Sequence, residues 1–146
     1  IIFGDLLNDR SKNMIFDLEK FTSFEGETGP YLQYTHARAC SILRKADKVT
    51  VKGNFILLSL SQEQALISLL SQFSDKVQHA ADNYKPHVLC RYLLDLAQSF
   101  NEFYHAVQVI SEDKELMKAR LLLVDGVRQV LENGLGLLGI KAPDEM

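Results

Sequence analysis

A short segment near the start of the chain places aromatic rings and cations on one side of a predicted helix. Thr28 and Pro30 favour a helix start there, because threonine caps the first turn and proline fits a turn with few internal hydrogen bonds. At about 100° per residue, Tyr31, Tyr34 and Arg38 project from one side of that helix. Flat rings beside cations suit the stacking of unpaired bases and the binding of phosphates. The spacing therefore predicts a nucleic-acid-binding surface.

Periodicity alone leaves a second interpretation open. Ser41 and Lys45 continue the aromatic and basic side of the helix. A separate apolar stripe would face the core and consists of Leu32, Ala39, Leu43 and Ala46. The tyrosines could instead cover a neighbouring helix with their hydroxyls in water. Exposed tyrosines that converge on one positive hollow would favour RNA, and separately buried tyrosines would favour packing.

The overall charge of the chain argues weakly against a nucleic-acid ligand. The 146 residues include 16 basic and 19 acidic side chains, which gives a net charge of −3. The charges are unevenly distributed, however: residues 31–46 contain Arg38, Arg44 and Lys45 and no acid. Such a local basic face can still hold RNA, with a steep dependence on salt. With 47% hydrophobic residues and no apolar run near 18 residues, we expect one domain with a core and no membrane span.

Other sequence patterns that suggest a chemical function occur in the wrong structural context for it. Residues 134–139 match G-x-G-x-x-G, but the run closes a predicted helix, whereas a dinucleotide fingerprint opens one after a strand. Close helix packing and a helix end explain it better. His87 and Cys90 have a metal-ligand spacing without a second pair, so we expect no metal site. We expect Cys40 and Cys90 to be buried free thiols.

The hydrophobic pattern predicts an all-α fold, an antiparallel helical bundle over residues 30–140. A period of three to four residues predicts helices over 30–47, from 61 to about 81 with a break at Ser74-Asp75, from 86 to 107, and over 116–138. The last of these should be the central helix, and Ser61 and Ser111 should act as caps. Taken alone, residues 49–59 predict a hairpin, with Gly53-Asn54 as a turn between apolar flanks.

Three stretches of the sequence resemble the class I arginyl-tRNA synthetases. The first runs from Phe16-Asp17 through Phe24-Glu25-Gly26-Glu27-Thr28-Gly29-Pro30-Tyr31-Leu32-Gln33-Tyr34 to Arg38 and residues 41–46. The second comprises residues 87–97 and Phe100-Asn101-Glu102-Phe103-Tyr104, similar to the central helix of the DALR-type anticodon-binding domain. The third comprises Ala119-Arg120-Leu121 and residues 137–146, similar to its last helix and tail. Together they cover nearly the whole chain.

The resemblance implies a division of the chain and a function. Residues 1–27 would be a linker from a catalytic domain absent from this chain, made of short extended or helical pieces, and residues 28–146 the helical anticodon-binding domain. Within that domain, residues 49–59 would be an irregular connection rather than a hairpin. The domain would position arginine-accepting tRNA for esterification by that catalytic domain, which would use ATP. This chain lacks the His-x-Gly-His and Lys-x-Ser-Lys signatures, so we expect it to have no cofactor and no enzymatic activity of its own. A monomeric, cytoplasmic protein is expected.

The resemblance also implies the tRNA-binding residues, which are Tyr31, Tyr34, Arg38, Arg44, Lys45, Tyr104 and Met146. One departure concerns the tail. The family often ends in Pro-Glu-Arg-Met, whereas this chain has Pro143-Asp144-Glu145-Met146. Glu145 replaces the cation, which weakens the case for a phosphate contact from the tail. The alternative function is a helical module that packs against a protein without contacting RNA.

Overall fold

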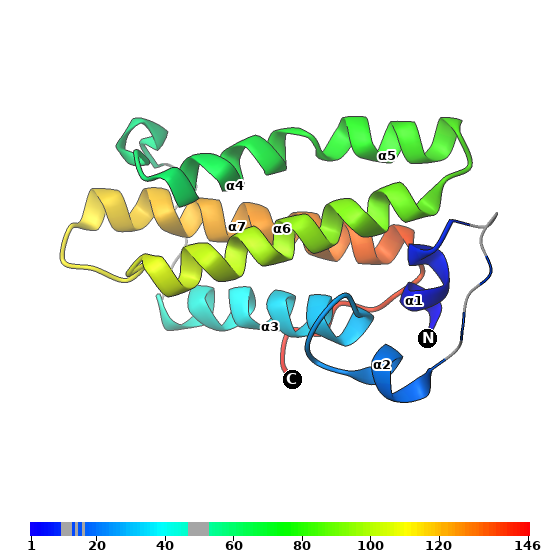
Figure 1. The fold of residues 1–146 in the computed structure, drawn as a ribbon. Helices are drawn as coiled ribbons and strands as arrows, with labels where there is room; N and C mark the ends of the chain where they lie inside the picture. Colours follow the sequence, from blue (N-terminus) through cyan, green and yellow to red (C-terminus); the bar gives the residue numbers. More distant parts are fainter. Residues whose placement is uncertain (10–12, 14, 16, 47–52) are drawn as a thin grey trace.

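The structure, a computed structural model, describes residues 1–9, 13, 15, 17–46 and 53–146 (Figure 1). The described residues form helices and no strand, which confirms the predicted all-α fold. The elements are α1 (Ile2–Leu7), α2 (Leu18–Thr22), α3 (Gly29–Lys45), the 3₁₀ turn η1 (Phe55–Leu57), α4 (Ser61–Ser71), α5 (Phe73–Asp82), α6 (Pro86–Ala106) and α7 (Lys114–Leu137).

The helices are stacked in layers, as Figure 1 shows. Helices α6 and α7 run antiparallel in the middle, with α3 on one side and the nearly continuous pair α4 and α5 on the other. Helix α6 contacts α1, α3, α4, α5 and α7. Residues 116–138 are predicted to form the central helix, and α7 does lie in the middle layer, but it shares that layer with α6.

Helix α3 starts as its sequence predicts. The Thr28 hydroxyl accepts a hydrogen bond from the Tyr31 N–H at 3.1 Å, and Pro30 occupies the first turn. The helix ends at Lys45; its predicted end, Asp47, lies outside the described residues. So do residues 49–52 of the predicted hairpin. The described remainder of that segment carries a 3₁₀ turn rather than a strand, so a hairpin through it is wrong.

Two other predicted caps are wrong. Helix α4 follows Leu60, whose N–H donates to Glu63 Oε2 at 3.0 Å, so the Glu63 carboxylate does the capping and Ser61 does not. Helix α7 is capped by Asp113, whose carboxylate accepts from the backbone N–H groups of Glu115 and Leu116. A carboxylate competes well with the Ser111 hydroxyl here, because it also stabilises the positive end of the helix dipole. The predicted break at Ser74-Asp75 exists, but it falls at Gln72.

The core lies along the buried face of α6. Leu93, Leu96, Phe100 and Phe103 are fully buried there, as the periodicity predicts. Gly134 of α7 lies directly against Leu93, where a β-carbon would approach Leu93 Cδ2 to 2.5 Å. Gly139, with φ of 74°, follows the end of α7. Close packing and a helix end are thus confirmed for the glycine-rich run.

A buried ion pair joins α4 to α7. Arg120 Nε donates to Glu63 Oε1 at 2.7 Å, and the Arg120 guanidinium also donates to the Gln108 carbonyl at 3.0 Å. Glu63 is fully buried and its other oxygen caps α4, so every charge-bearing oxygen of this carboxylate has a donor. Complete hydrogen bonding is what makes a buried charge tolerable.

The two ends of the chain pack on the bundle in different ways. Near the start, α1 lies against α6 and α3 with Phe3 almost fully buried, while Ile15, Leu18 and Phe24 are exposed. At the other end, residues 139–146, here called the C-terminal segment, fold back along α3. This return brings the last residues beside the aromatic and basic side of α3.

Candidate nucleic-acid interface

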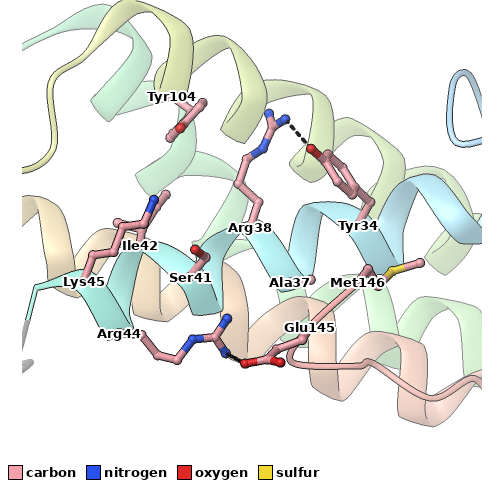
Figure 2. A pocket seen from close by; sticks show the side chains of 10 residues that line it. All are labelled: Tyr34, Ala37, Arg38, Ser41, Ile42, Arg44, Lys45, Tyr104, Glu145 and Met146. Atoms are coloured by element: carbon pink, nitrogen blue, oxygen red, sulfur yellow. Dashed lines mark hydrogen bonds and ion pairs between the residues drawn. The ribbon is translucent and has the colours of Figure 1, made fainter.

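One hollow collects most of the residues singled out from the sequence. It encloses about 440 Å³ between the outer side of α3, the end of α6 and the C-terminal segment (Figure 2). We call it the α3 hollow; its lining is Tyr34, Ala37, Arg38, Ser41, Ile42, Arg44, Lys45, Tyr104, Glu145 and Met146. Six of the seven predicted tRNA-binding residues therefore meet in one place.

Arg38 lies between two tyrosine rings in this hollow. Its guanidinium carbon is 4.9 Å from the centroid of the Tyr34 ring and 4.9 Å from that of Tyr104, which are cation–π distances. Arg38 also donates to the Tyr34 hydroxyl at 3.2 Å (Figure 2). Both rings remain about 40% exposed. Both tyrosines thus keep surface that a ligand can reach, beside a cation.

Further charges line the rest of the hollow. Arg44 and Lys45 are exposed near the end of α3, and Glu145 forms a 3.4 Å ion pair with Arg44. Met146 lies beside Tyr34 and Ala37, with more than half of its surface exposed (Figure 2). The lining therefore combines three cations with one carboxylate.

Tyr31 lies outside the α3 hollow. Its ring is half-buried against the core, and its hydroxyl accepts from Asn101 Nδ2 at 2.9 Å. It lines a different depression, shared with Glu27 and Arg91 of a surface ion pair. Tyr34 and Tyr104 therefore meet the criterion that favours RNA, convergence on a positive, open hollow, and Tyr31 does not share that hollow.

Sequence reasoning missed the role of Asn101 in joining α6 to α3. Its Oδ1 accepts from Arg38 at 3.0 Å, and its Nδ2 also lies 3.3 Å from the Thr35 hydroxyl. The sequence does carry a signal: Asn101 stands one turn before Tyr104 between the core residues Phe100 and Phe103. A polar side chain at the edge of an apolar helix face is partly buried and therefore needs a hydrogen-bond partner.

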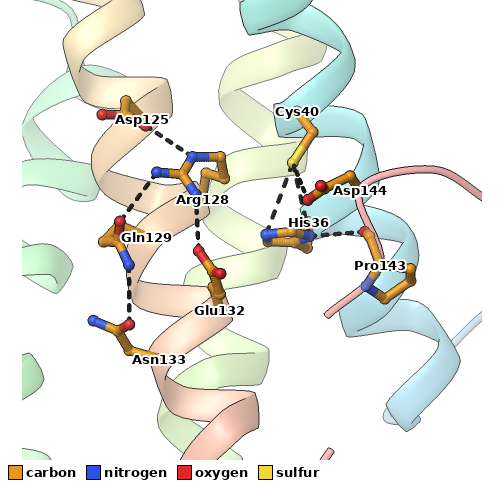
Figure 3. A network of polar contacts seen from close by, with 9 residues as sticks. All are labelled: His36, Cys40, Asp125, Arg128, Gln129, Glu132, Asn133, Pro143 and Asp144. Atoms are coloured by element: carbon orange, nitrogen blue, oxygen red, sulfur yellow. Dashed lines mark hydrogen bonds and ion pairs between the residues drawn. The ribbon is translucent and has the colours of Figure 1, made fainter. Parts of the chain in front are cut away.

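The C-terminal segment is held to α3 by polar contacts that the sequence does not reveal (Figure 3). The buried His36 ring donates from Nδ1 to the Pro143 carbonyl at 2.9 Å, and Gln33 donates to the Lys141 carbonyl at 2.7 Å. The Asp144 carbonyl accepts from Arg44 at 3.1 Å. These contacts fix the place of Glu145 and Met146 at the hollow.

His36, Cys40 and Asp144 form a group whose metal-binding atoms lie within 4.8 Å of one another, the one such group in the described part of the chain. Cys40 Sγ is 3.8 Å from both ring nitrogens of His36, so it lies over the ring face, whereas a nitrogen lone pair lies in the ring plane. The thiol donates to Asp144 Oδ1 at 3.6 Å. The geometry fits a hydrogen-bonded contact between helix and tail better than a metal centre.

The two cysteines are buried free thiols, as predicted. Burial, followed by the nearby Asp144 carboxylate, raises the pKa of Cys40 to about 11. Burial raises the pKa of Cys90 to about 12. Since the thiolate is the reactive form, neither group is suited to nucleophilic chemistry.

None of the described helices combines the length and the apolarity needed to cross a bilayer.

The model of the DALR anticodon binding domain family matches residues 32–146. Among curated proteins, the arginine–tRNA ligases of Levilactobacillus brevis and Clostridioides difficile are 47% and 44% identical, over all of this chain and 26% of each protein. The chain thus spans about a quarter of the length of these relatives.

A solved structure agrees with the sequence matches. The arginyl-tRNA synthetase of Thermus thermophilus superposes with a TM-score of 0.91 at 40% identity, over 99% of this chain and 26% of that one. The resemblance inferred from the motifs is therefore confirmed across nearly the whole chain. This chain belongs to the DALR anticodon-binding domain family, and its relatives are arginine–tRNA ligases.

Proposed function

We propose that this chain is the anticodon-binding domain of an arginine–tRNA ligase and that the α3 hollow receives the anticodon loop. The observation that carries the proposal is the stack of Tyr34, Arg38 and Tyr104 at an exposed, cation-lined surface. Loop bases are unpaired, so their faces can stack on aromatic rings and on a guanidinium plane.

The remaining lining residues suit other parts of a loop. Arg44 and Lys45 are exposed cations at the rim, where they would meet phosphates. Met146 supplies a flexible apolar side chain that can adapt to a base. Tyr31 would touch RNA only where the RNA extends past the hollow toward Glu27 and Arg91.

The proposal extends to the longer protein. By analogy with the relatives, which are arginine–tRNA ligases, a catalytic domain would join arginine to the tRNA held here. The family resemblance adds ATP as the co-substrate, and we propose a cytoplasmic monomer. We keep residues 1–27 as the linker to that domain, since Ile15, Leu18 and Phe24 of this segment expose apolar surface. This chain alone should show no arginine-dependent ATP–pyrophosphate exchange; exchange in a clean preparation would contradict the assignment.

The same exposed apolar residues favour a second candidate function. A helical module that only packs against a protein would use this surface and leave the α3 hollow without a ligand. The two functions differ in whether RNA binds at all.

A titration with two tRNAs at about 50 mM and 200 mM salt tests the proposal. The chain should bind arginine tRNA more tightly than a tRNA with another anticodon. Arg44 and Lys45 meeting single-stranded phosphates would give a slope of log affinity against log salt of about −1.4. Equal affinity for both tRNAs, or an affinity independent of salt, would contradict a specific RNA site.

A further inference from the structure

Arg38 is held more firmly than an exposed arginine needs to be. Its guanidinium has two hydrogen-bond partners, Asn101 Oδ1 and the Tyr34 hydroxyl, in addition to the two flanking rings. No acidic side chain among the described residues forms an ion pair with it. The positive charge is therefore placed without being neutralised.

The chemistry of the neighbours fixes which way the Asn101 amide points. A guanidinium has no acceptor, so the atom that faces Arg38 must be the oxygen. The Thr35 hydroxyl already donates to the Tyr31 carbonyl at 2.9 Å, so toward Asn101 it accepts. The amide nitrogen thus faces Thr35 and the Tyr31 hydroxyl, and both ends of the amide are matched.

We propose that Asn101 is a positioning residue, which holds the Arg38 guanidinium between the Tyr34 and Tyr104 rings and so directs its remaining N–H groups toward an oxygen of the RNA. A guanidinium has five N–H donors, and only two are engaged with Asn101 and Tyr34. An arginine held in one rotamer loses less conformational freedom on binding than a mobile one. Asn101 itself touches no ligand in this account.

The first arm of the test needs no RNA and therefore does not depend on the proposed function. Protons of Arg38 that lie over two ring faces resonate upfield in the NMR spectrum. In Asn101→Leu, which keeps the side-chain volume, these resonances should move toward those of a mobile arginine. Unchanged shifts in the folded variant would overturn the positioning role.

The second arm rests on the proposed function and uses a double-mutant cycle of RNA affinity. Asn101→Ala and Asn101→Leu should each weaken binding of arginine tRNA roughly tenfold, the worth of one hydrogen bond to a charged group. In an Arg38→Ala background the same changes should have less than about a twofold effect, since the partner is gone. A merely structural asparagine would weaken both backgrounds equally.

Matched controls separate the possible failures. Asn133→Ala removes an exposed amide from α7, where it lies beside α5 and bonds to Gln129, outside both depressions on α3, and should leave the affinity unchanged. Melting temperatures identify any variant that unfolds. If Asn101→Ala unfolds, Asn101→Leu still tests the proposal. If Arg38→Ala weakens binding but the asparagine changes add to it fully, the positioning role is wrong and the RNA site stands. If Arg38→Ala has no effect, the role of Arg38 in the proposed function is wrong.

Discussion

Glu145 is the acidic side chain that the described structure places inside the cation-lined α3 hollow. Its ion pair with Arg44 joins two exposed groups, and such pairs contribute about 0–1 kcal/mol. An RNA phosphate can therefore displace Glu145 from Arg44 at little cost, but the carboxylate still repels the phosphate. Glu145 therefore weakens the affinity for RNA of the site that the cations of the α3 hollow form.

Glu145→Gln should accordingly strengthen binding of arginine tRNA by a factor of about two to five, within the range of an exposed charge pair. The salt dependence of the affinity should steepen, because Arg44 becomes free to release a counterion from the RNA. Asp75→Asn serves as the control, since Asp75 is an exposed acid of α5 on the opposite side of the bundle. An unchanged or weaker affinity for the Glu145 variant would remove Glu145 and Arg44 from the site.

The buried thiols and Tyr92 predict how stability depends on alkaline pH. In the folded chain the pKa values of Cys40, Cys90 and Tyr92 are raised to about 11, 12 and 12 by burial. Ordinary values are 9.0 for cysteine and 10.0 for tyrosine, so above pH 9 the unfolded chain loses these protons first. The free energy of unfolding should therefore be full below pH 9 and fall as the pH rises toward 11 and 12.

Denaturant unfolding between pH 8 and pH 11 measures this loss, with Cys90→Ala as the comparison. Removing the Cys90 thiol should make the decline shallower. A decline of the same steepness in both proteins would show that Cys90 ionises normally in the folded chain.

Two glycines of α7 show how closely the middle layer is packed. A β-carbon at Gly134 would clash with the fully buried Leu93, whereas one at Gly136 would meet nothing within 4 Å. Gly134→Ala should destabilise the fold by about 1–3 kcal/mol, as expected for overpacking. Gly136→Ala should instead stabilise it by about 0.4–1 kcal/mol, because alanine restricts the unfolded chain. Urea unfolding of the two variants checks both signs; equal effects would mean that α6 and α7 are not in close contact here.

The helices were predictable from sequence because their signals are local. Thr28 and Pro30 define the start of α3, Pro86 lies in the first turn of α6, and Gly139 follows the end of α7. The capping residues were less predictable. A serine, an aspartate or a glutamate within one turn of a helix start can each cap that helix, and only the folded structure selects one of them. The aromatic and basic side of α3 was found for the same reason: it repeats along a single helix.

At the scale of the whole molecule, the site depends on contacts that no local pattern contains. His36 and Pro143 are separated by 107 residues, and Arg38 and Asn101 by 63. The C-terminal segment has no hydrophobic period, so only the family resemblance of its tail, and no local pattern, indicated that Met146 belongs with the residues of α3. Tyr31 and Tyr34 share one side of α3 in sequence but line different depressions, because α6 lies across that side. The net charge of −3 does not describe the α3 hollow, whose lining carries three cations and one carboxylate.

The most direct test compares two tyrosine variants in paired measurements of arginine-tRNA affinity and melting temperature. Tyr34→Ala removes a half-exposed ring from the α3 hollow, and Tyr84→Ala removes an exposed ring from the turn before α6, at the end remote from Tyr104. Tyr34→Ala should weaken binding by about 1–3 kcal/mol, the worth of one stacked base, with little change in melting temperature. Tyr84→Ala should leave the affinity intact. A Tyr34→Ala protein that melts earlier but binds unchanged in its folded fraction would contradict the account, because the ring would then serve packing and not RNA.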